Sequence, residues 1–299
     1  ITSNPTIFQK AMATGDAYDA QLAELTSAGA STVDAYWAAV TKDITDALDI
    51  LAPVHEASDG LDGYVSLELA PELARETDAS TEAARQLHTT IARPNLYVKI
   101  PGTAEGLPAI QQMIAEGRSI NVTLIFGLDR YAEVIEAYLA GLEAAEGDLS
   151  GVSSVASFFV SRLDTALDPM LAERRPDLRG QIANANAKLA YQEYLEIFGG
   201  GHFAALRAAG ARPQRLLWAS TSTKNPDYPD LLYVDNLIGP DTINTMPPAT
   251  YDAFRNHGVV ARTLDQDVEV ALARLAALPE LGIDLSAVTD QLEIDGVNA

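Results

Sequence analysis

The chain has 299 residues, of which 47% are hydrophobic and 21% charged, so it has ample apolar material for a buried core. Its formal net charge of −22 repels nucleic acid and anionic membranes and argues against both as partners. Cysteine is absent, which excludes disulfides, thiolate nucleophiles and cysteine metal sites and fits a reducing compartment. No apolar stretch reaches the roughly 18 residues of a membrane span, and we expect a cytoplasmic protein.

Strand-like and helix-like segments alternate along the chain. Most strand-like runs are rich in Val, Ile, Leu and Phe on both faces, which is typical of parallel strands covered by helices. Strands are predicted at residues 1–6, 63–69, 95–101, 120–126, 153–160, 215–221 and 242–247. Amphipathic helices are predicted at residues 32–51, 81–91, 104–116, 129–146, 183–198 and 265–278. Asp129 is the expected N-cap of the fourth helix, and the "GGG" at 199–201 should end the fifth.

This order amounts to about seven β-then-α units. An open parallel sheet and a (β/α)8 barrel both accommodate it, and we favour an α/β fold of the (β/α)8 TIM barrel type. The composition stays even and contains no linker-like segment, so we expect residues 1–299 to form a single domain. Because Ile1 already stands in a predicted strand, we expect the first barrel strand to be missing and the domain to be truncated at both ends.

A lysine at position 99 interrupts the otherwise apolar run "NLYVKIP" (95–101). Burial penalises the charged ammonium, and a neutral amine is a nucleophile that can form a Schiff base with a carbonyl. The structural alternative is that Lys99 reaches past the strand to water or pairs with a carboxylate. The "PGT" that follows keeps the lysine at the carboxyl end of its strand, where sites of parallel α/β folds lie. Polar residues also end most other predicted strands, as expected for a site at that edge.

Five segments together resemble the transaldolase family, of the type found in actinobacteria and cyanobacteria. They are "ITSNPTIF" (1–8), "VKIPGTAEG" (98–106), "INVTLIF" (120–126), "SFFVSRLD" (157–164) and "WASTSTKNP" (218–226). The resemblance runs over essentially the whole chain and implies a (β/α)8 barrel of the class I aldolase kind, working without metal or organic cofactor. It implies transfer of a dihydroxyacetone unit between sugar phosphates in the non-oxidative pentose phosphate pathway, with Lys99 as the Schiff-base lysine. The usual reaction converts sedoheptulose 7-phosphate and glyceraldehyde 3-phosphate to erythrose 4-phosphate and fructose 6-phosphate.

The resemblance also implies roles for other residues, position by position. Glu68 would act through a water in forming and dehydrating the carbinolamine, and Thr123 would help to position that water. Asn4 and Asn121 would hold hydroxyls of the donor, although Asn4 before Pro5 fits a turn equally well. The residues implied to line the pocket are Ser66, Ser157 and the aromatic wall Phe159. The structural alternatives are a solvated strand end for Glu68, an ordinary strand residue for Thr123 and a core residue for Phe159.

Phosphate recognition would fall to Arg162, Ser220 and Lys224. Arginine offers a planar fork that suits phosphate, and lysine offers a point charge. In a chain of net charge −22, two cations beside one pocket would supply the local positive field that an anionic substrate needs. The spacing within "STSTK" leaves Ser222 open in place of Ser220, and the alternative for Lys224 is an ordinary loop lysine.

Two other functions stay open. A fructose-6-phosphate aldolase would release dihydroxyacetone after protonation of the enamine, but Phe159 has no hydroxyl to donate near the iminium, which favours the transferase. A non-catalytic sugar-phosphate-binding barrel is supported only by the absence from this sequence of an aspartate that the family carries on its first strand. The scattered histidines lack metal-binding spacing, so no metal site is expected. The oligomeric state is not fixed, and a homodimer is one alternative.

Overall fold

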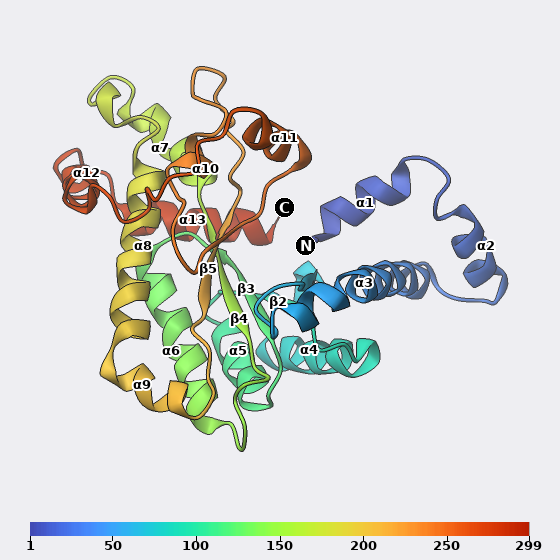
Figure 1. Ribbon diagram of the computed structural model, residues 1–299. Coiled ribbons are helices and arrows are strands. Elements are labelled where there is room, and N and C mark those ends of the chain that lie inside the picture. The colour runs from blue at the N-terminus through green and yellow to red at the C-terminus, as the bar shows by residue number, and fades with distance from the viewer. Residues whose placement is uncertain (299) are drawn as a thin grey trace.

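The structure, a computed structural model, describes residues 1–298 and is built on a parallel β-sheet (Figure 1). Its six strands lie in chain order, each paired with the next. They are β1 (Val65–Glu68), β2 (Leu96–Pro101), β3 (Ile120–Ile125), β4 (Ser154–Phe159), β5 (Arg215–Ala219) and β6 (Ile243–Asn244). The α/β class and the parallel sheet are confirmed. Closure into an eight-stranded barrel stays a prediction, because within residues 1–298 β6 does not pair with β1.

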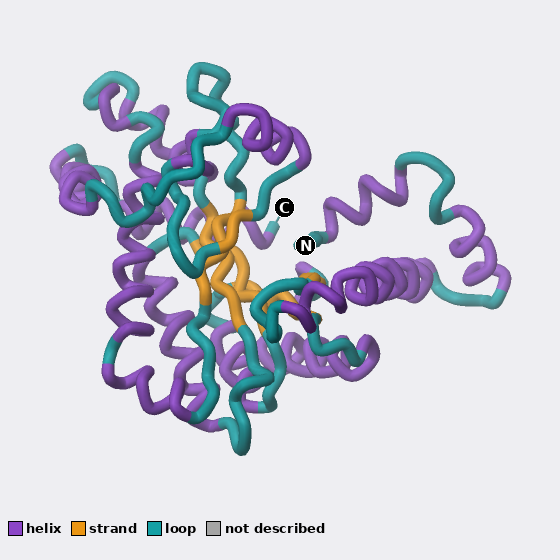
Figure 2. Tube along the Cα trace, viewed as in Figure 1, coloured by secondary structure: helices purple, strands orange, loops and turns teal. Residues whose placement is uncertain are grey.

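Helices pack over one face of the sheet and carry the chain from the end of one strand to the start of the next (Figure 2). They are α1 (Pro5–Ala13), α2 (Asp19–Ser27), α3 (Thr32–Ala57), α4 (Thr77–Ile91), α5 (Gly106–Ala115), α6 (Leu128–Ala144), α7 (Ser161–Leu171), α8 (Ile182–Gly199), α9 (Gly201–Ala208), α10 (Leu232–Asp235), α11 (Pro248–His257), α12 (Val268–Glu280) and α13 (Leu285–Val297). The successive helices α4, α5, α6 and α8 contact one another along the outside of the sheet. Within the described part of the chain, no helix has both the length and the apolar character to cross a membrane.

The prediction of a strand over residues 1–6 is wrong. Only Thr2 pairs with the sheet, through an isolated parallel bridge to Ser66, and a helix begins at Pro5. The Asn4 side chain accepts a hydrogen bond from the Ile7 amide at 2.8 Å, and proline stands at the first helical position. Both features favour a helix start, because the cap satisfies a free amide and proline has none to satisfy.

The prediction for the start of α6 needs a smaller correction. Its N-cap is Gly127, which has no side chain to cap with, and Asp129 lies inside the first turn. There the carboxylate accepts a hydrogen bond from Ser286 Oγ at 3.1 Å, so it joins α6 to α13. The "GGG" ends α8 at Gly199 as predicted, and a further helix, α9, begins at Gly201.

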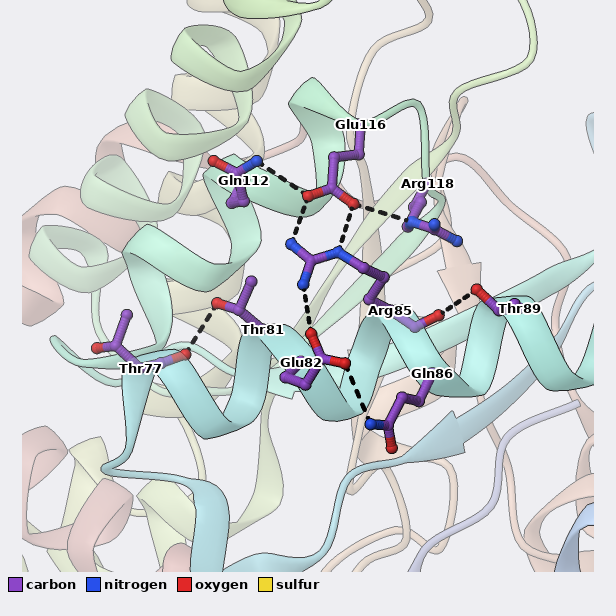
Figure 3. A network of polar contacts seen from close by, with 9 residues as sticks. All are labelled: Thr77, Thr81, Glu82, Arg85, Gln86, Thr89, Gln112, Glu116 and Arg118. Atoms are coloured by element: carbon purple, nitrogen blue, oxygen red, sulfur yellow. Dashed lines mark hydrogen bonds and ion pairs between the residues drawn. The ribbon is translucent and has the colours of Figure 1, made fainter.

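An ion-pair network joins the neighbouring outer helices α4 and α5 (Figure 3). Arg85 donates to both oxygens of Glu116, at 3.0 and 2.6 Å, and to Glu82 at 2.6 Å. The hydrogen bonds from Arg85 lower the pKa of Glu116 to about 2, because they favour the charged carboxylate. These side chains are largely open to solvent, so the network contributes little to stability and mainly orients α4 against α5.

Candidate active site

The two faces of the sheet carry different side chains, because successive residues of a strand point to opposite sides. One face, which includes Val98, Ile100 and Phe158, packs in the main hydrophobic core under the helices. The other face begins with a smaller apolar cluster that contains Tyr97 and Leu217. On this face, the side chains nearer the carboxyl ends of the strands are polar, and those near the ends of β1 and β2, Glu68 and Lys99, are ionisable. The predicted site residues of β1 to β4 all lie on this second face.

A short chain of hydrogen bonds crosses the sheet above the apolar cluster. Asn121 of β3 donates through Nδ2 to Ser66 Oγ on β1 at 3.0 Å, and its Oδ1 accepts from Ser157 Oγ on β4 at 2.7 Å. All three residues are buried. The amide of Asn121 is therefore fixed in orientation by its two serine neighbours, and the three residues form a polar floor for the layer above.

Lys99 lies in that upper layer and is only 6% exposed. The register places it directly opposite Glu68 on β1 and Asn121 on β3. Its Nζ donates to Glu68 Oε2 at 2.8 Å and to the Ser3 carbonyl oxygen at 3.2 Å. The structure thus contains the carboxylate partner that the structural alternative for Lys99 required. A buried charge without a partner is costly, so each of these two side chains offsets part of the desolvation cost of the other.

Thr123 stands next to this pair with a free hydroxyl. Its Oγ1 is shielded from solvent and has no hydrogen-bond partner within residues 1–298. The register of β3 against β4 shifts between Val122 and Ile125, and Leu124 adopts a left-handed φ of 61°. Left-handed conformations are uncommon for leucine and concentrate at functional sites. The bulge ends regular pairing just where the Thr123 side chain meets the cavity.

Arg162, in the first turn of α7, supplies the positive charge at the opposite side of the layer. Its guanidinium lies 5.2 Å from the centre of the Phe159 ring, a cation–π contact. It is half-buried, and within the described residues no hydrogen bond or ion pair engages it. Burial lowers the pKa of Arg162, while the nearby charge of Glu68 raises it. An unpaired, partly desolvated guanidinium is suited to binding an anion.

A cavity of about 340 Å³ connects these groups. Of the predicted site residues, those that line it are Asn4, Glu68, Lys99, Thr123, Phe159 and Arg162. The volume lies at the small end of the range for ligand pockets and matches a small metabolite. The fold therefore brings the three predicted ionisable residues Glu68, Lys99 and Arg162 to one cavity.

The remaining predicted residues lie elsewhere. Ser66, Asn121 and Ser157 form the buried floor described above. Ser220 adopts a left-handed φ of 55° just after β5 and its Oγ lies 3.0 Å from Ser161 Oγ; it does not line the cavity. Lys224 is exposed and lines a separate cavity with Arg179 and Tyr228. Asn4 reaches the Lys99 cavity, but its side-chain oxygen is engaged in capping α1.

Three of the lining residues that were not predicted stand out: Tyr36 of α3, and Gly296 and Val297 of α13. None carries a local motif, and all come from helices far from the strands in sequence. The only sequence signal for α13 is Asp284, whose side chain caps the helix by accepting from the Ala287 amide at 3.2 Å. The contact of α13 with the cavity arises from tertiary packing.

The arrangement places a primary amine, a carboxylate, a free hydroxyl and a guanidinium around one small cavity. An amine can attack a carbonyl, and a carboxylate 2.8 Å away can take and return its proton. The guanidinium can hold an anionic group at the far side of the same substrate. This set fits a covalent reaction on a carbonyl compound that carries a negative charge.

Comparison with known proteins gives one consistent family. Residues 1–299 match the model of the family described as Transaldolase/Fructose-6-phosphate aldolase. The chain is 51% identical to a protein named "Transaldolase" from Thermobifida fusca (strain YX), with 100% of the chain and 83% of that relative covered. It is 52% identical to "Transaldolase" from Parafrankia sp. (strain EAN1pec), over 99% of the chain and 83% of the relative. It is 48% identical to "Transaldolase 2" from a Nostoc species, over 100% of the chain and 83% of the relative.

Proposed function

The chain belongs to the transaldolase/fructose-6-phosphate aldolase family, and on this premise we propose that it transfers a dihydroxyacetone unit through Lys99. It is a transferase enzyme with transaldolase activity, like the relatives that it matches over its whole length. The proposed donors and acceptors are sugar phosphates: sedoheptulose 7-phosphate with glyceraldehyde 3-phosphate, giving erythrose 4-phosphate and fructose 6-phosphate. We also propose a fold of the (β/α)8 barrel type and a cytoplasmic location, the latter supported by the absence of cysteine.

The proposal for Lys99 rests on one observation: a buried primary amine, 2.8 Å from a carboxylate, lines a cavity that also holds an unpaired guanidinium. Lys99 gives its proton to Glu68 and attacks the ketone carbon of the donor. The carbinolamine then loses water, with Glu68 returning the proton to the departing hydroxyl, to form an iminium. Thr123, whose hydroxyl has no hydrogen-bond partner among residues 1–298, holds the water that carries these protons.

The iminium then acts as an electron sink. The bond between C3 and C4 of the donor breaks, and its electrons move toward the iminium to give an enamine. The C4 hydroxyl gives its proton, through the water in the cavity, to the Glu68 carboxylate, and the first aldehyde leaves. The enamine carbon then attacks the carbonyl of a second aldehyde, the new alkoxide takes that proton back from Glu68, and the iminium is regenerated. Water then attacks the iminium carbon and releases the product and Lys99.

Arg162 binds the phosphate group. The donor's hydroxyls are assigned to Asn121, Ser66 and Ser157, which are buried beneath the residues that line the cavity, so binding requires them to exchange hydrogen bonds that they now make with one another.

Borohydride trapping tests this proposal. The protein is incubated with fructose 6-phosphate, reduced, digested and analysed by mass spectrometry, and the Lys99→Arg variant is the control. We expect a reduced adduct on Lys99 and none on the variant. An adduct on another lysine, such as Lys224, would contradict the assignment of the nucleophile.

A fructose-6-phosphate aldolase is the second candidate, because the family model includes both activities. Phe159, at the wall of the cavity, offers no hydroxyl to protonate the enamine, and this supports the transferase. The assay is incubation with fructose 6-phosphate alone, followed by addition of an acceptor aldehyde. Free dihydroxyacetone in large excess over enzyme before the acceptor is added would support the aldolase instead.

A further inference from the structure

We infer that Gly296, in the last turn of α13, sets the room beside Arg162 and thereby determines which sugar phosphates the cavity accepts. The inference rests on the proposed function, in which Arg162 binds the phosphate group of the substrate. It concerns the helix α13, which packs against β3 and α7 (Figure 1).

The position of α13 is fixed by several contacts with the start of α6. Arg130 Nε lies 3.2 Å from Glu293 Oε2, and Glu293 has a side chain only 12% exposed. Ser286 donates to Asp129, and Thr289 packs so closely on Gly127 that a Cβ there would lie 2.8 Å from Thr289 Oγ1. These contacts leave little freedom for the helix to slide or tilt, so its last turn is held at the cavity wall.

Gly296 faces the two cavity residues Leu124 and Arg162. A Cβ on residue 296 would lie 2.9 Å from Leu124 Cδ2 and 3.6 Å from Nη1 of Arg162. The first distance is shorter than carbon atoms tolerate, so a neighbour would have to move. Any side chain at position 296 would therefore enter the space next to the guanidinium.

Backbone conformation does not explain the glycine. Gly296 lies in a helix and is not among the residues with positive φ. Glycine is a poor helix former, and alanine is the best, so helix propensity opposes glycine at this position. The feature that distinguishes this position is the close approach of the Leu124 side chain, whereas Nη1 of Arg162 lies at ordinary van der Waals distance from the Cβ position.

The two neighbours differ in their ability to yield. Leu124 is held in a left-handed conformation in the bulge after Thr123 and is only 7% exposed. Arg162 has no ion-pair or hydrogen-bond partner within residues 1–298 and lies over the Phe159 ring. A methyl group at position 296 would displace the end of the Leu124 side chain and would stand in van der Waals contact with Nη1 of Arg162, so it would occupy space beside the guanidinium.

The experiment compares Gly296→Ala with the parent, using fructose 6-phosphate and sedoheptulose 7-phosphate as donors at a saturating acceptor concentration. We expect KM to rise about tenfold for the phosphorylated donors and more for the longer one, with kcat changed by less than about twofold. Unphosphorylated fructose should show no comparable rise in KM. Gly199→Ala is the matched control, because no atom lies within 4 Å of the Cβ position there.

A double variant separates the inference from simple packing damage. Leu124→Ala removes the leucine atoms that a Cβ at position 296 would meet. The double variant Gly296→Ala/Leu124→Ala should therefore regain most of the affinity lost by Gly296→Ala.

An unchanged KM in Gly296→Ala, or an equal rise of KM for fructose and fructose 6-phosphate, would overturn the inference. Calorimetric titration with inorganic phosphate provides a readout that needs no turnover: the Kd should rise in Gly296→Ala and not in Gly199→Ala. If the parent had no transaldolase activity but Gly296→Ala still bound phosphate more weakly than the parent, the proposed function would be contradicted and the role of Gly296 would stand.

Discussion

Lys99 and Glu68 stand opposite each other on adjacent parallel strands, so the sheet register, and not a loop, sets the distance between them. Lys99 could be singled out from the sequence because a lysine in an apolar strand is rare. The contact of Lys99 with Glu68 could not be predicted, because the register of two strands about 30 residues apart is decided by packing along the whole sheet.

Lys224 is the opposite case. The residues around it in sequence predicted that it would line the Lys99 cavity, but the loop after β5 places it at a separate cavity.

Replacing Glu68 tests the proton transfer assigned to it. We expect Glu68→Gln to lower kcat about 100-fold, because the amide cannot take the proton of Lys99, while KM changes little. The circular dichroism spectrum should stay that of the parent. Glu72→Gln is the control, since Glu72 is nearby, exposed and unpaired with Lys99. Equal losses in the two variants would argue that Glu68 has no special part in the chemistry.

Replacing Arg162 tests phosphate recognition. Arg162→Ala should raise KM for fructose 6-phosphate about 100-fold and leave KM for fructose within a few-fold, because only the charged group loses its partner. Arg255→Ala serves as the comparison, since Arg255 also lies over an aromatic ring, Tyr251, but is exposed and does not line the cavity. A similar rise of KM for both donors would indicate that Arg162 has a structural role.

At the level of secondary structure, Asp164 connects three helices behind the site. Its Oδ1 accepts from the Ala183 amide at the start of α8 at 2.8 Å, and its Oδ2 accepts from the Tyr233 hydroxyl of α10 at 2.9 Å. The residue itself belongs to α7, two positions after Arg162. Burial raises the pKa of Asp164 to about 7, despite the hydrogen bonds that favour the charged form.

The raised pKa of Asp164 predicts a pH dependence of stability. An unfolded aspartate titrates near pH 4, so between about pH 4 and pH 7 the folded state binds the proton more tightly. The contribution of this group to the free energy of unfolding is therefore present at low pH and falls as pH rises to 7, by at most about 1.4 kcal/mol per pH unit. Asp164→Asn should flatten this fall when Tm is measured at pH 5, 6, 7 and 8. Parallel Tm curves for the variant and the parent would contradict the prediction.

The helices differ in how well the sequence predicts them. Those with long amphipathic patterns, such as α3 and α8, were predicted to within a few residues at most ends. The helix α1 is not among the predicted helices although Asn4 and Pro5 are a helix-start signal, because the predicted strand over residues 1–6 includes both of them. The helix α13 has a weakly amphipathic sequence, and its place depends on long-range contacts such as that of Arg130 with Glu293.

For the whole molecule, the net charge of −22 opposes the approach of anionic substrates. Within the cavity, Arg162 attracts them, but over distances longer than a Debye length the negative surface dominates. We predict that kcat/KM for fructose 6-phosphate rises as ionic strength increases from about 10 mM to about 100 mM, as salt screens the repulsion. Steady-state kinetics with fructose as the uncharged comparison, which should show no trend, checks this. A fall over the same range would mean that the local positive field of the cavity outweighs the surface.

The ion pair between Lys99 and Glu68 has a consequence for how the site handles charge. The Lys99 amine and the Glu68 carboxylate are already in hydrogen-bond contact at 2.8 Å, and both side chains are largely buried. Moving the proton between them converts a charged pair into a neutral one without changing the total charge of the site. In the proposed mechanism, the nucleophilic amine therefore forms while the proton stays inside the site, so the net charge that a substrate meets is the same before and after the transfer.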